Sequence, residues 1–513
     1  MSLPKPIGRQ KEVLCLPAQG HFAVLGTAGS GKTTLAILRA AYLASPGTDH
    51  QGKTLLVTFN TALVTYLKHL QDRRLANVAI ENYHKFARGY LAQRNQMSRN
   101  AIISPEKRDY FINKAVEQVS TFYESHPIFD NPKNLFSEEI RWIAQHGITS
   151  YETYKNEPHL GGGEVRFKRE ELELVFEIYQ AYRDLRSHKY DWDDIATVVC
   201  SEFDADNSPR LYRHIVIDEG QDFSPEMIRS LAKAIPTDGS LTFFGDVAQQ
   251  IYGHRMSWRS AGLTIDKIWE FKENYRNTKQ IAKLGLAISQ MPYFRGISDL
   301  VEPTSPTADG PLPTLVEFSS RNQEIEFVVN VAVRLAKTQS IAILFRFRQD
   351  ENSIKDYLPP GSIRLHRDMT TWQAKPGIRY GTYHSAKGLE FDAVILPFCN
   401  NQRLPDPEAV TAFGEADAAA QDGRLLYVGV TRADNQAEVL VPDQIDISDI
   451  LAIALPSPTQ ARNEIVRLRL QGISEDRFKF IITPDLFDKH TLSQYIRSGK
   501  RPQETPWIPR DEQ

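Results

Sequence analysis

The feature that most constrains this chain is a glycine-rich loop at residues 26–33, with the sequence Gly-Thr-Ala-Gly-Ser-Gly-Lys-Thr. It fits the pattern G-x-x-x-x-G-K-[ST], in which backbone N–H groups surround phosphate oxygens. Apolar residues 22–25 predict a short buried strand before the loop, and residues 34–41 predict a helix after it. The helix N-terminus would add its positive dipole end to the loop amides. The alternative is a glycine-rich turn that binds nothing, and the flanking strand and helix make it the weaker interpretation.

The loop predicts a site for a nucleoside triphosphate, ATP, with Mg²⁺. Lys32 is expected to reach the β- and γ-phosphates, and the Thr33 hydroxyl to hold the metal ion. Gln10 lies just before the first strand, and a glutamine amide can pair with the N6 and N7 atoms of adenine. The residues expected to bind the phosphates are Gly26, Thr27, Ala28, Gly29, Ser30, Gly31, Lys32, Thr33 and Thr34.

A second motif supplies the acidic half of a hydrolytic site. Residues 214–217 predict a buried strand, which ends in the pair Asp218 and Glu219. Asp218 is expected to hold Mg²⁺, and Glu219 to orient and deprotonate the attacking water. Such a pair is a weak signal alone, but a strong one in a chain that also carries a phosphate loop.

The bulk properties exclude several classes of protein. The 513 residues suffice for about three to four domains. A net charge of −3 gives no overall attraction to nucleic acid, so any such groove must be local. Three scattered cysteines indicate a reducing compartment without a disulfide framework. No apolar leader and no run of about 18 apolar residues occurs, so we expect a cytoplasmic protein.

The pattern of elements predicts an α/β fold with two halves. Further strands are expected at residues 54–59, 78–80, 241–244, 315–318, 341–346, 393–396 and 437–441. Helical periodicity dominates residues 88–198, which we expect to be a helical insertion in the first half. Residues 424–433 are expected to form a helix with two arginines. The acidic residues 191–194 are interpreted as a helix N-cap and solvated face rather than a metal site.

Two segments fall at the carboxyl ends of predicted strands, where open α/β sheets bind ligands. They are residues 58–60, Thr-Phe-Asn, and the pair Tyr83 and His84. Phe59 could equally be a core residue.

Taken in order, these motifs resemble those of the UvrD/Rep-type superfamily 1 helicases, over residues 8–442. The resemblance implies two RecA-like domains of the P-loop NTPase class that hydrolyse ATP at their interface. It further implies an ATP hydrolase that moves 3′ to 5′ along single-stranded DNA; RNA stays open as an alternative. The implied domains are 1A (residues 1–87 and 199–275), 1B (88–198), 2A (276–455) and a tail (456–513), in which residues 460–470 read as a helix.

The resemblance also assigns roles. Gln249 resembles the γ-phosphate sensor, Tyr275 the tyrosine stacked on adenine, and Glu390 the ribose contact. Arg276 and Arg432 resemble the two arginine fingers, although a surface ion pair is the default interpretation of any single arginine. The implied nucleic-acid contacts are Thr58, Phe59, Asn60, Tyr83, His84, Tyr252, His254, Arg255, Trp258 and His384.

Two departures from the family pattern affect the expected activity. About 35 residues separate Arg346 from Thr382, too few for the 2B domain that the family usually inserts there, so processive unwinding is in question. His254 stands where the family commonly has a base-stacking aromatic, and Trp258 is a candidate to compensate.

Three functional hypotheses follow. The first is a nucleic-acid-stimulated ATPase motor. The second is a nucleic-acid- or nucleotide-sensing ATPase that switches a partner, such as a nuclease in antiviral defence, since the chain also resembles the helicase-like subunit of Gabija antiphage systems in size and layout. The third is an unrelated P-loop protein, which would leave residues 387–391, Lys-Gly-Leu-Glu-Phe, unexplained.

Overall fold

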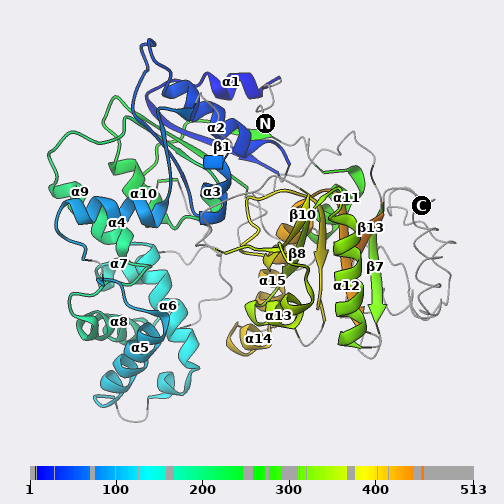
Figure 1. Ribbon diagram of the computed structural model, residues 1–513. Coiled ribbons are helices and arrows are strands. Elements are labelled where there is room, and N and C mark those ends of the chain that lie inside the picture. The colour runs from blue at the N-terminus through cyan, green and yellow to red at the C-terminus, as the bar shows by residue number, and fades with distance from the viewer. Residues whose placement is uncertain are drawn as a thin grey trace.

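The structure is a computed structural model of the chain. It describes residues 6, 8–27, 29–69, 75–98, 100–123, 126–157, 167–246, 258–259, 261–271, 277–289, 310, 312–318, 320–366, 376–400, 403–413, 415–442 and 452–455. Two sheets, each flanked by helices, lie side by side, and a third, all-helical unit lies below the first sheet (Figure 1).

The first sheet has six parallel strands in the order β3-β2-β4-β5-β1-β6. Its strands are β1 (Gly20–Gly26), β2 (Thr54–Thr58), β3 (Val78–Asn82), β4 (His214–Ile217), β5 (Ser240–Gly245) and β6 (Ile268–Phe271). Every residue of β2, β4 and β5 is buried, because helices cover both faces of the sheet.

Helices pack against both faces of this sheet and form one hydrophobic core on each face. One face packs against α1 (Gln10–Leu14), α2 (Lys32–Leu43) and α3 (Thr61–His69). The other packs against α4 (Tyr83–Gln93), α9 (Ile195–Ala205) and α10 (Pro225–Lys233). Both helices that flank the insertion, α4 and α9, therefore belong to the core of the sheet.

The helical unit between α4 and α9 has a hydrophobic core of its own. It comprises α5 (Pro105–Ser120), the 3-10 helix η2 (Pro127–Asp130), α6 (Lys133–Gln145), α7 (Tyr151–Asn156) and α8 (Leu172–Arg186). Ile112, Phe136 and Ile178 are at most 1% exposed within that core. No helix in the described ranges is long and apolar enough to cross a membrane.

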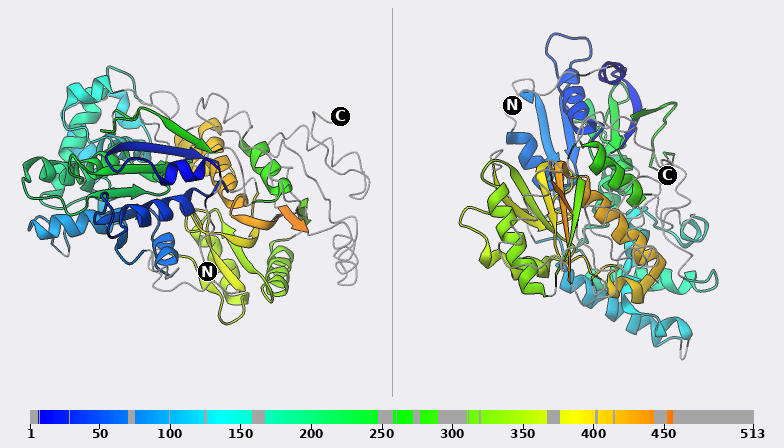
Figure 2. Two further views of the ribbon diagram at one scale, coloured as in Figure 1. Left: turned by 90° about the horizontal axis from the view of Figure 1, so that it is seen from above. Right: turned by 90° about the vertical axis from the view of Figure 1, so that its right-hand side faces the viewer.

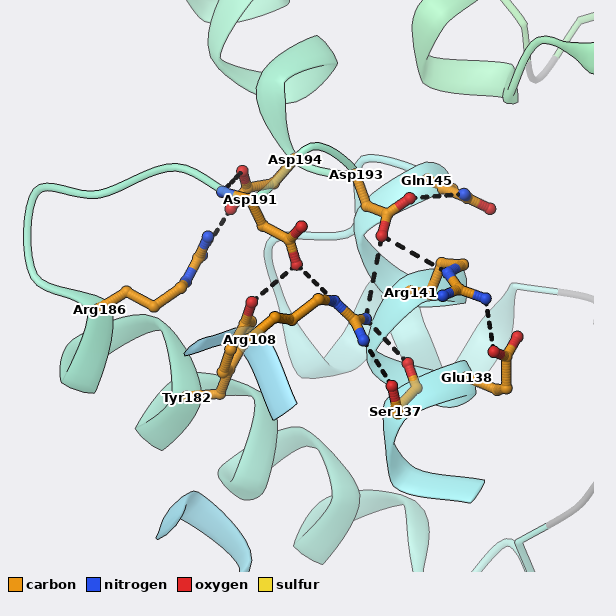
Figure 3. A network of polar contacts seen from close by, with 10 residues as sticks. All are labelled: Arg108, Ser137, Glu138, Arg141, Gln145, Tyr182, Arg186, Asp191, Asp193 and Asp194. Atoms are coloured by element: carbon orange, nitrogen blue, oxygen red, sulfur yellow. Dashed lines mark hydrogen bonds and ion pairs between the residues drawn. The ribbon is translucent and has the colours of Figure 1, made fainter. Parts of the chain in front are cut away.

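The acidic residues 191–194 join this helical unit to the sheet, and the expectation of a solvated face is wrong (Figure 3). Asp191 is 4% exposed and accepts hydrogen bonds from Arg108 Nε at 2.8 Å and the Tyr182 hydroxyl at 2.7 Å. Asp194 pairs with Arg186 at 2.5 Å. Arginines from the helical unit neutralise the carboxylates, which is why they can be buried. No cluster of potential metal ligands occurs among the described residues.

The second sheet has seven strands in the order β13-β7-β12-β11-β8-β10-β9, all parallel except β13. Figure 2 shows the molecule from two further directions. They are β7 (Leu312–Phe318), β8 (Ser340–Phe345), β9 (Ile363–Arg364), β10 (Gly377–Thr382), β11 (Phe391–Leu396), β12 (Ala433–Pro442) and β13 (Ala452–Leu455). Its helices are α11 (Lys279–Ser289), α12 (Arg321–Leu335), α13 (Arg348–Ile354), the 3-10 helix η6 (Lys355–Tyr357), α14 (Pro407–Phe413) and α15 (Glu415–Val430). Two parallel-sheet α/β units confirm the predicted fold class.

One predicted element ends earlier than expected. The helix expected over residues 424–433 stops at Val430, so Arg432 lies in the turn between α15 and β12. The Asn277 amide donates to the carbonyls of Thr431 at 3.3 Å and Ala433 at 2.5 Å, which holds this turn. The helix expected at residues 460–470 lies outside the described residues.

Candidate functional site

The glycine-rich loop connects β1 to α2, as its sequence predicts. Gly29 and Gly31 have φ values of 76° and 82°, in the left-handed region that favours glycine. A Cβ atom at Gly26 would lie 2.6 Å from Ser30 Oγ and 3.1 Å from the Phe271 carbonyl oxygen. The loop can therefore turn this tightly only with glycine at these positions.

Lys32 lies across the loop, and its surroundings suit a phosphate ligand. Its Nζ donates to the carbonyl oxygens of Gly26 at 2.8 Å and Thr27 at 2.6 Å, and lies 3.5 Å from an Asp246 carboxylate oxygen. The hydroxyls of Thr27 and Ser30 are buried without a hydrogen-bond partner in the described part of the chain. Buried polar atoms without partners are costly unless a ligand satisfies them, so the loop fits a phosphate group.

The end of β4 brings Asp218 next to the loop. The Thr33 hydroxyl bonds to this carboxyl group, while burial and the neighbouring Glu219 charge raise the pKa of Asp218 to about 7. One of its oxygens, Oδ2, has no partner among the described residues. A hydroxyl and a carboxylate are the hard oxygen ligands that Mg²⁺ prefers, so Thr33 and Asp218 fit that ion.

Glu219 is kept ionised beside Asp218. Burial would raise its pKa, but the charges of Arg432, Lys387 and Lys32 and a hydrogen bond from Gln221 outweigh burial and hold the pKa below the usual value. Its φ of 53° is unusual for a residue with a side chain, and such backbone strain concentrates at functional sites. Two adjacent carboxyl groups with pKa values pushed apart suit one to bind a cation and the other to accept a proton.

Gln221 ties Glu219 to the next strand. Its Nε2 donates to Glu219 Oε2 at 2.5 Å, and its Oε1 accepts from the Asp246 backbone N–H, at the end of β5, at 2.9 Å. Gly220, between Glu219 and Gln221, is also required to be glycine, because a Cβ there would overlap the Phe243 ring.

The second unit reaches this site through the loop after β10. Lys387 Nζ forms an ion pair with Asp222, and both side chains are at most 3% exposed. Asn60, at the end of β2, donates from its side-chain amide to the Lys387 carbonyl oxygen. Gly388 has a φ of 77°, and a Cβ there would lie 2.7 Å from Leu63 on α3. A glycine is needed here for both the backbone conformation and the close approach of the two units.

Arg432 is the second basic group of this unit at the site. It is 2% exposed, and its Nε donates to the Val428 carbonyl oxygen at 3.2 Å. Its charge is the strongest electrostatic influence that lowers the pKa of Glu219. The structure thus brings Arg432 of the second unit close enough to Glu219 of the first to affect its ionisation.

An aromatic cluster lies beyond the ends of β2 and β3. The Phe59 and His84 rings meet edge to face at 5.5 Å, and His84 meets Trp192 at 4.9 Å. The Arg88 guanidinium carbon lies over the Trp192 ring, 5.9 Å from its centroid. The sequence motifs did not predict that Arg88 and Trp192 belong to this cluster. The one indication in the sequence was an aromatic residue, Trp192, within the acidic segment 191–194.

Three other expected nucleic-acid contacts are wholly or partly enclosed. Tyr83 is fully buried with its hydroxyl 2.8 Å from Ser230 Oγ, so its side chain supports the fold rather than facing a nucleic acid. Trp258 packs half-buried against Phe243, with ring centroids 5.0 Å apart. His384 is half-buried, and burial lowers its pKa to about 4. A short stretch of sequence cannot show whether an aromatic ring faces the core or the surface.

The remaining predicted residues divide into described and undescribed ones. Gln10 begins α1, and its Nε2 donates to the Ser30 carbonyl oxygen at 3.4 Å, which places it beside the loop. Thr34 follows Thr33 on α2, Thr58 is fully buried at the end of β2, and Glu390 is exposed. The predictions that fall outside the described residues are Ala28, Gln249, Tyr252, His254, Arg255, Tyr275 and Arg276.

This geometry defines the class of the protein: a P-loop nucleoside triphosphatase with two RecA-like units that meet at the phosphate site. Residues 8–275 match the model of the UvrD/REP helicase N-terminal domain, and residues 362–437 match that of the UvrD-like helicase C-terminal domain. The chain belongs to the UvrD/REP helicase family.

Named relatives agree with this membership at low identity. A Mycoplasma pneumoniae protein named "Probable DNA helicase" is 23% identical over 448 residues, which covers 81% of this chain and 79% of that protein. The protein named "ATP-dependent DNA helicase UvrD2" of Mycobacterium tuberculosis is 21% identical over 553 residues, which covers 83% of this chain and 77% of that protein.

Proposed function

We propose that this chain is an ATP-driven motor that moves 3′ to 5′ along single-stranded DNA and hydrolyses ATP between its two sheets. The observation that carries the proposal is the buried ion pair between Lys387 of the second unit and Asp222 of the first. This ion pair joins the acidic motif after β4 to the loop after β10. A conformational change in one unit at the phosphate site would therefore displace the other unit.

The residues present support a proposal for the steps of hydrolysis. Lys32 and the loop amides would bind the phosphates, and Thr33 with Asp218 would hold the metal ion. Bound Mg²⁺ and ATP supply a γ-phosphoryl group with its charge neutralised. Glu219, held ionised, takes the proton of the attacking water. Arg432 approaches from the second unit and stabilises charge that develops during transfer.

The contacts of Asn60 and Gly388 support coupling between this site and a nucleic-acid track. Asn60 follows β2, at the edge of the sheet where Phe59 and His84 lie, and its amide bonds to the Lys387 backbone. A movement of the Lys387 loop would therefore shift Asn60, and Asn60 is adjacent in sequence to Phe59 of the aromatic cluster. The 3′-to-5′ direction rests on the family resemblance.

The short connection between β8 and β10 supports a limited role in strand separation. These strands pair directly, and in the described ranges between them lie only α13, η6 and β9. We propose that the chain lacks a 2B domain and translocates better than it unwinds.

ATPase measurements test the motor. The rate of the wild type is measured alone and with single-stranded DNA, duplex DNA and RNA, with Lys32→Ala as the inactive control. Single-stranded DNA should raise the rate at least about tenfold and Lys32→Ala should abolish it. A wild-type rate that none of the three nucleic acids raises would contradict the proposal.

The short β8–β10 connection also favours a second candidate, an ATPase subunit that switches a partner protein such as a nuclease in phage defence. Displacement of streptavidin from the 5′ end of biotinylated single-stranded DNA separates the two. The motor displaces it with ATP, whereas the switch hydrolyses ATP without displacement. Co-purification of a nuclease from the native host would favour the switch.

A further inference from the structure

Arg39 is a fully buried arginine of α2, the helix that follows the phosphate loop, and it is not one of the residues at the phosphate site. Its Nη1 donates to the carbonyl oxygens of Leu14 at 3.0 Å and Leu16 at 2.6 Å, and its Nη2 to that of Pro17 at 2.6 Å. All three acceptors lie where the chain leaves the C-terminal end of α1.

The charge of Arg39 has no carboxylate partner within the described ranges, since its hydrogen bonds go to backbone carbonyls. Burial lowers its pKa to about 10, so it stays protonated at neutral pH. Burying an unpaired charge costs free energy, and a methionine could fill much of the same space without that cost. What the arginine adds is the fork of donors that fixes three carbonyl groups at once.

The α1 helix needs such an anchor. It has only five residues, Gln10–Leu14, and a helix this short is not stable by itself. Val13 is its only buried side chain, while Lys11 and Glu12 are exposed. The last carbonyls of a helix lack partners within it, and Arg39 takes that of Leu14. The position of α1 on α2 therefore depends on Val13 and Arg39.

The other end of α1 carries Gln10. Its amide donates to the carbonyl oxygen of Ser30, inside the phosphate loop, at 3.4 Å. With a rise of about 1.5 Å per residue, the helix transmits a shift at Leu14 to Gln10 over about 6 Å. We propose that Arg39 is a positioning residue that sets Gln10 against the base of the nucleotide, and so determines the preference for adenine over guanine. This inference rests on the proposed adenine-reading role of Gln10.

The test compares nucleotide preference in Arg39→Met, Gln10→Ala and the wild type. Displacement of a fluorescent ATP analogue by ATP, GTP and inorganic triphosphate gives three affinities without any DNA. In Arg39→Met and in Gln10→Ala, ATP should bind about tenfold more weakly, while GTP and triphosphate change less than about twofold. The same variants should raise KM for ATP with kcat changed less than about twofold. Leu231→Ala, in the opposite core of the same unit, is the matched control: it should lower stability but keep the ATP-to-GTP ratio.

Three results would overturn the inference. One is a folded Arg39→Met that keeps the wild-type ATP-to-GTP ratio; another is equal weakening of ATP, GTP and triphosphate, which would mean that the whole loop has collapsed. The third is a wild type without a preference for ATP. If Arg39→Met does not fold, Arg39→Gln is tested in the same way with the same criteria. Absence of DNA stimulation would contradict the motor while leaving these ratios intact, so the two failures are distinguishable.

Discussion

At the residue scale, the two carboxyl groups after β4 are separated in function by their surroundings. Burial and the Glu219 charge favour the protonated form of Asp218. Glu219 faces Arg432, Lys387 and Lys32, which favour its ionised form. The sequence pair Asp-Glu is therefore given one cation-binding member and one basic member by neighbours from both units.

Replacing Glu219 tests this division. Glu219→Gln keeps the shape of the side chain and removes the proton acceptor, so the ATPase rate should fall by about 10² to 10⁴ while ATP affinity stays within about threefold. Steady-state ATPase and equilibrium nucleotide binding measure the two effects. Glu202→Gln, at a half-exposed ion pair with Arg94, should leave both unchanged. A Glu219→Gln enzyme with more than a tenth of the wild-type rate would exclude Glu219 as the base.

Gly388 permits a second residue-scale test. Gly388→Ala adds a methyl group 2.7 Å from Leu63 Cδ2 at a φ of 77°. Gly361→Ala, at a φ of 96° with no atom within 4 Å, imposes the same kind of strain without the contact. Both should lose about 1–2 kcal/mol of stability, but only Gly388→Ala should lower DNA-stimulated ATPase, and Leu63→Ala should partly restore it. Equal activity in the two glycine variants would mean that the contact does not matter.

At the element scale, buried arginines form polar contacts that, together with apolar packing, fix the attachments of two elements. Arg39 fixes α1 to α2, and Arg108 of α5 fixes the helical unit to the segment that leads into α9. Arg108 also donates to Ser137 on α6, so three segments converge on one guanidinium (Figure 3). Buried ionic contacts of this kind add little net stability but fix geometry.

Removing the ion pair between Arg108 and Asp191 should lower the free energy of unfolding, because it leaves a carboxylate buried without its partner. Arg108→Met leaves Asp191 without its ion pair and should lower the free energy of unfolding by about 3–5 kcal/mol. The double variant Arg108→Met/Asp191→Leu removes both charges and should recover at least half of that loss. Urea unfolding followed by circular dichroism measures both. A double variant less stable than Arg108→Met would show that the pair itself is strongly stabilising.

At the scale of the whole molecule, the first sheet should be sensitive to mild acid. His214 begins β4 and is fully buried between Ser240 and the His50 carbonyl oxygen. Burial is the main cause that lowers its pKa to about 4, from 6.5. Well above pH 6.5 the histidine is neutral in both the folded and the unfolded chain, so burying it neutral costs no free energy of unfolding. As the pH falls from 6.5 towards 4, the unfolded chain binds a proton that the folded one does not, so stability falls.

The expected loss between pH 6.5 and 4 is at most about 3 kcal/mol. It is measured as the free energy of urea unfolding at several pH values for the wild type and His214→Gln, which cannot titrate there. The wild type should lose more stability than the variant over this interval. Parallel pH profiles would show that His214 does not titrate on unfolding.

The sequence predicted the parts of this molecule that depend on local order. The loop at residues 26–33 and the pair after β4 carry their meaning in spacing alone, and both lie where expected. The partners of Asp191 and Arg39 could not be predicted, because Arg108 and Pro17 lie far from them along the chain. Tyr83 shows a third limit, since an aromatic residue beside a strand end fits a core as well as a surface.

We propose that ATP is hydrolysed between the two units. DNA-stimulated ATPase of Arg432→Ala tests it most directly, because Arg432 belongs to the second unit while the phosphate loop belongs to the first. Arg334→Ala is the matched control, since the last turn of α12 leads to the opposite end of the second sheet, where β8 begins.

We expect Arg432→Ala to bind ATP but to lose a factor of about 10³ or more in the rate of hydrolysis, and Arg334→Ala to keep the wild-type rate. A folded Arg432→Ala protein that hydrolyses ATP within tenfold of the wild type would contradict the proposal.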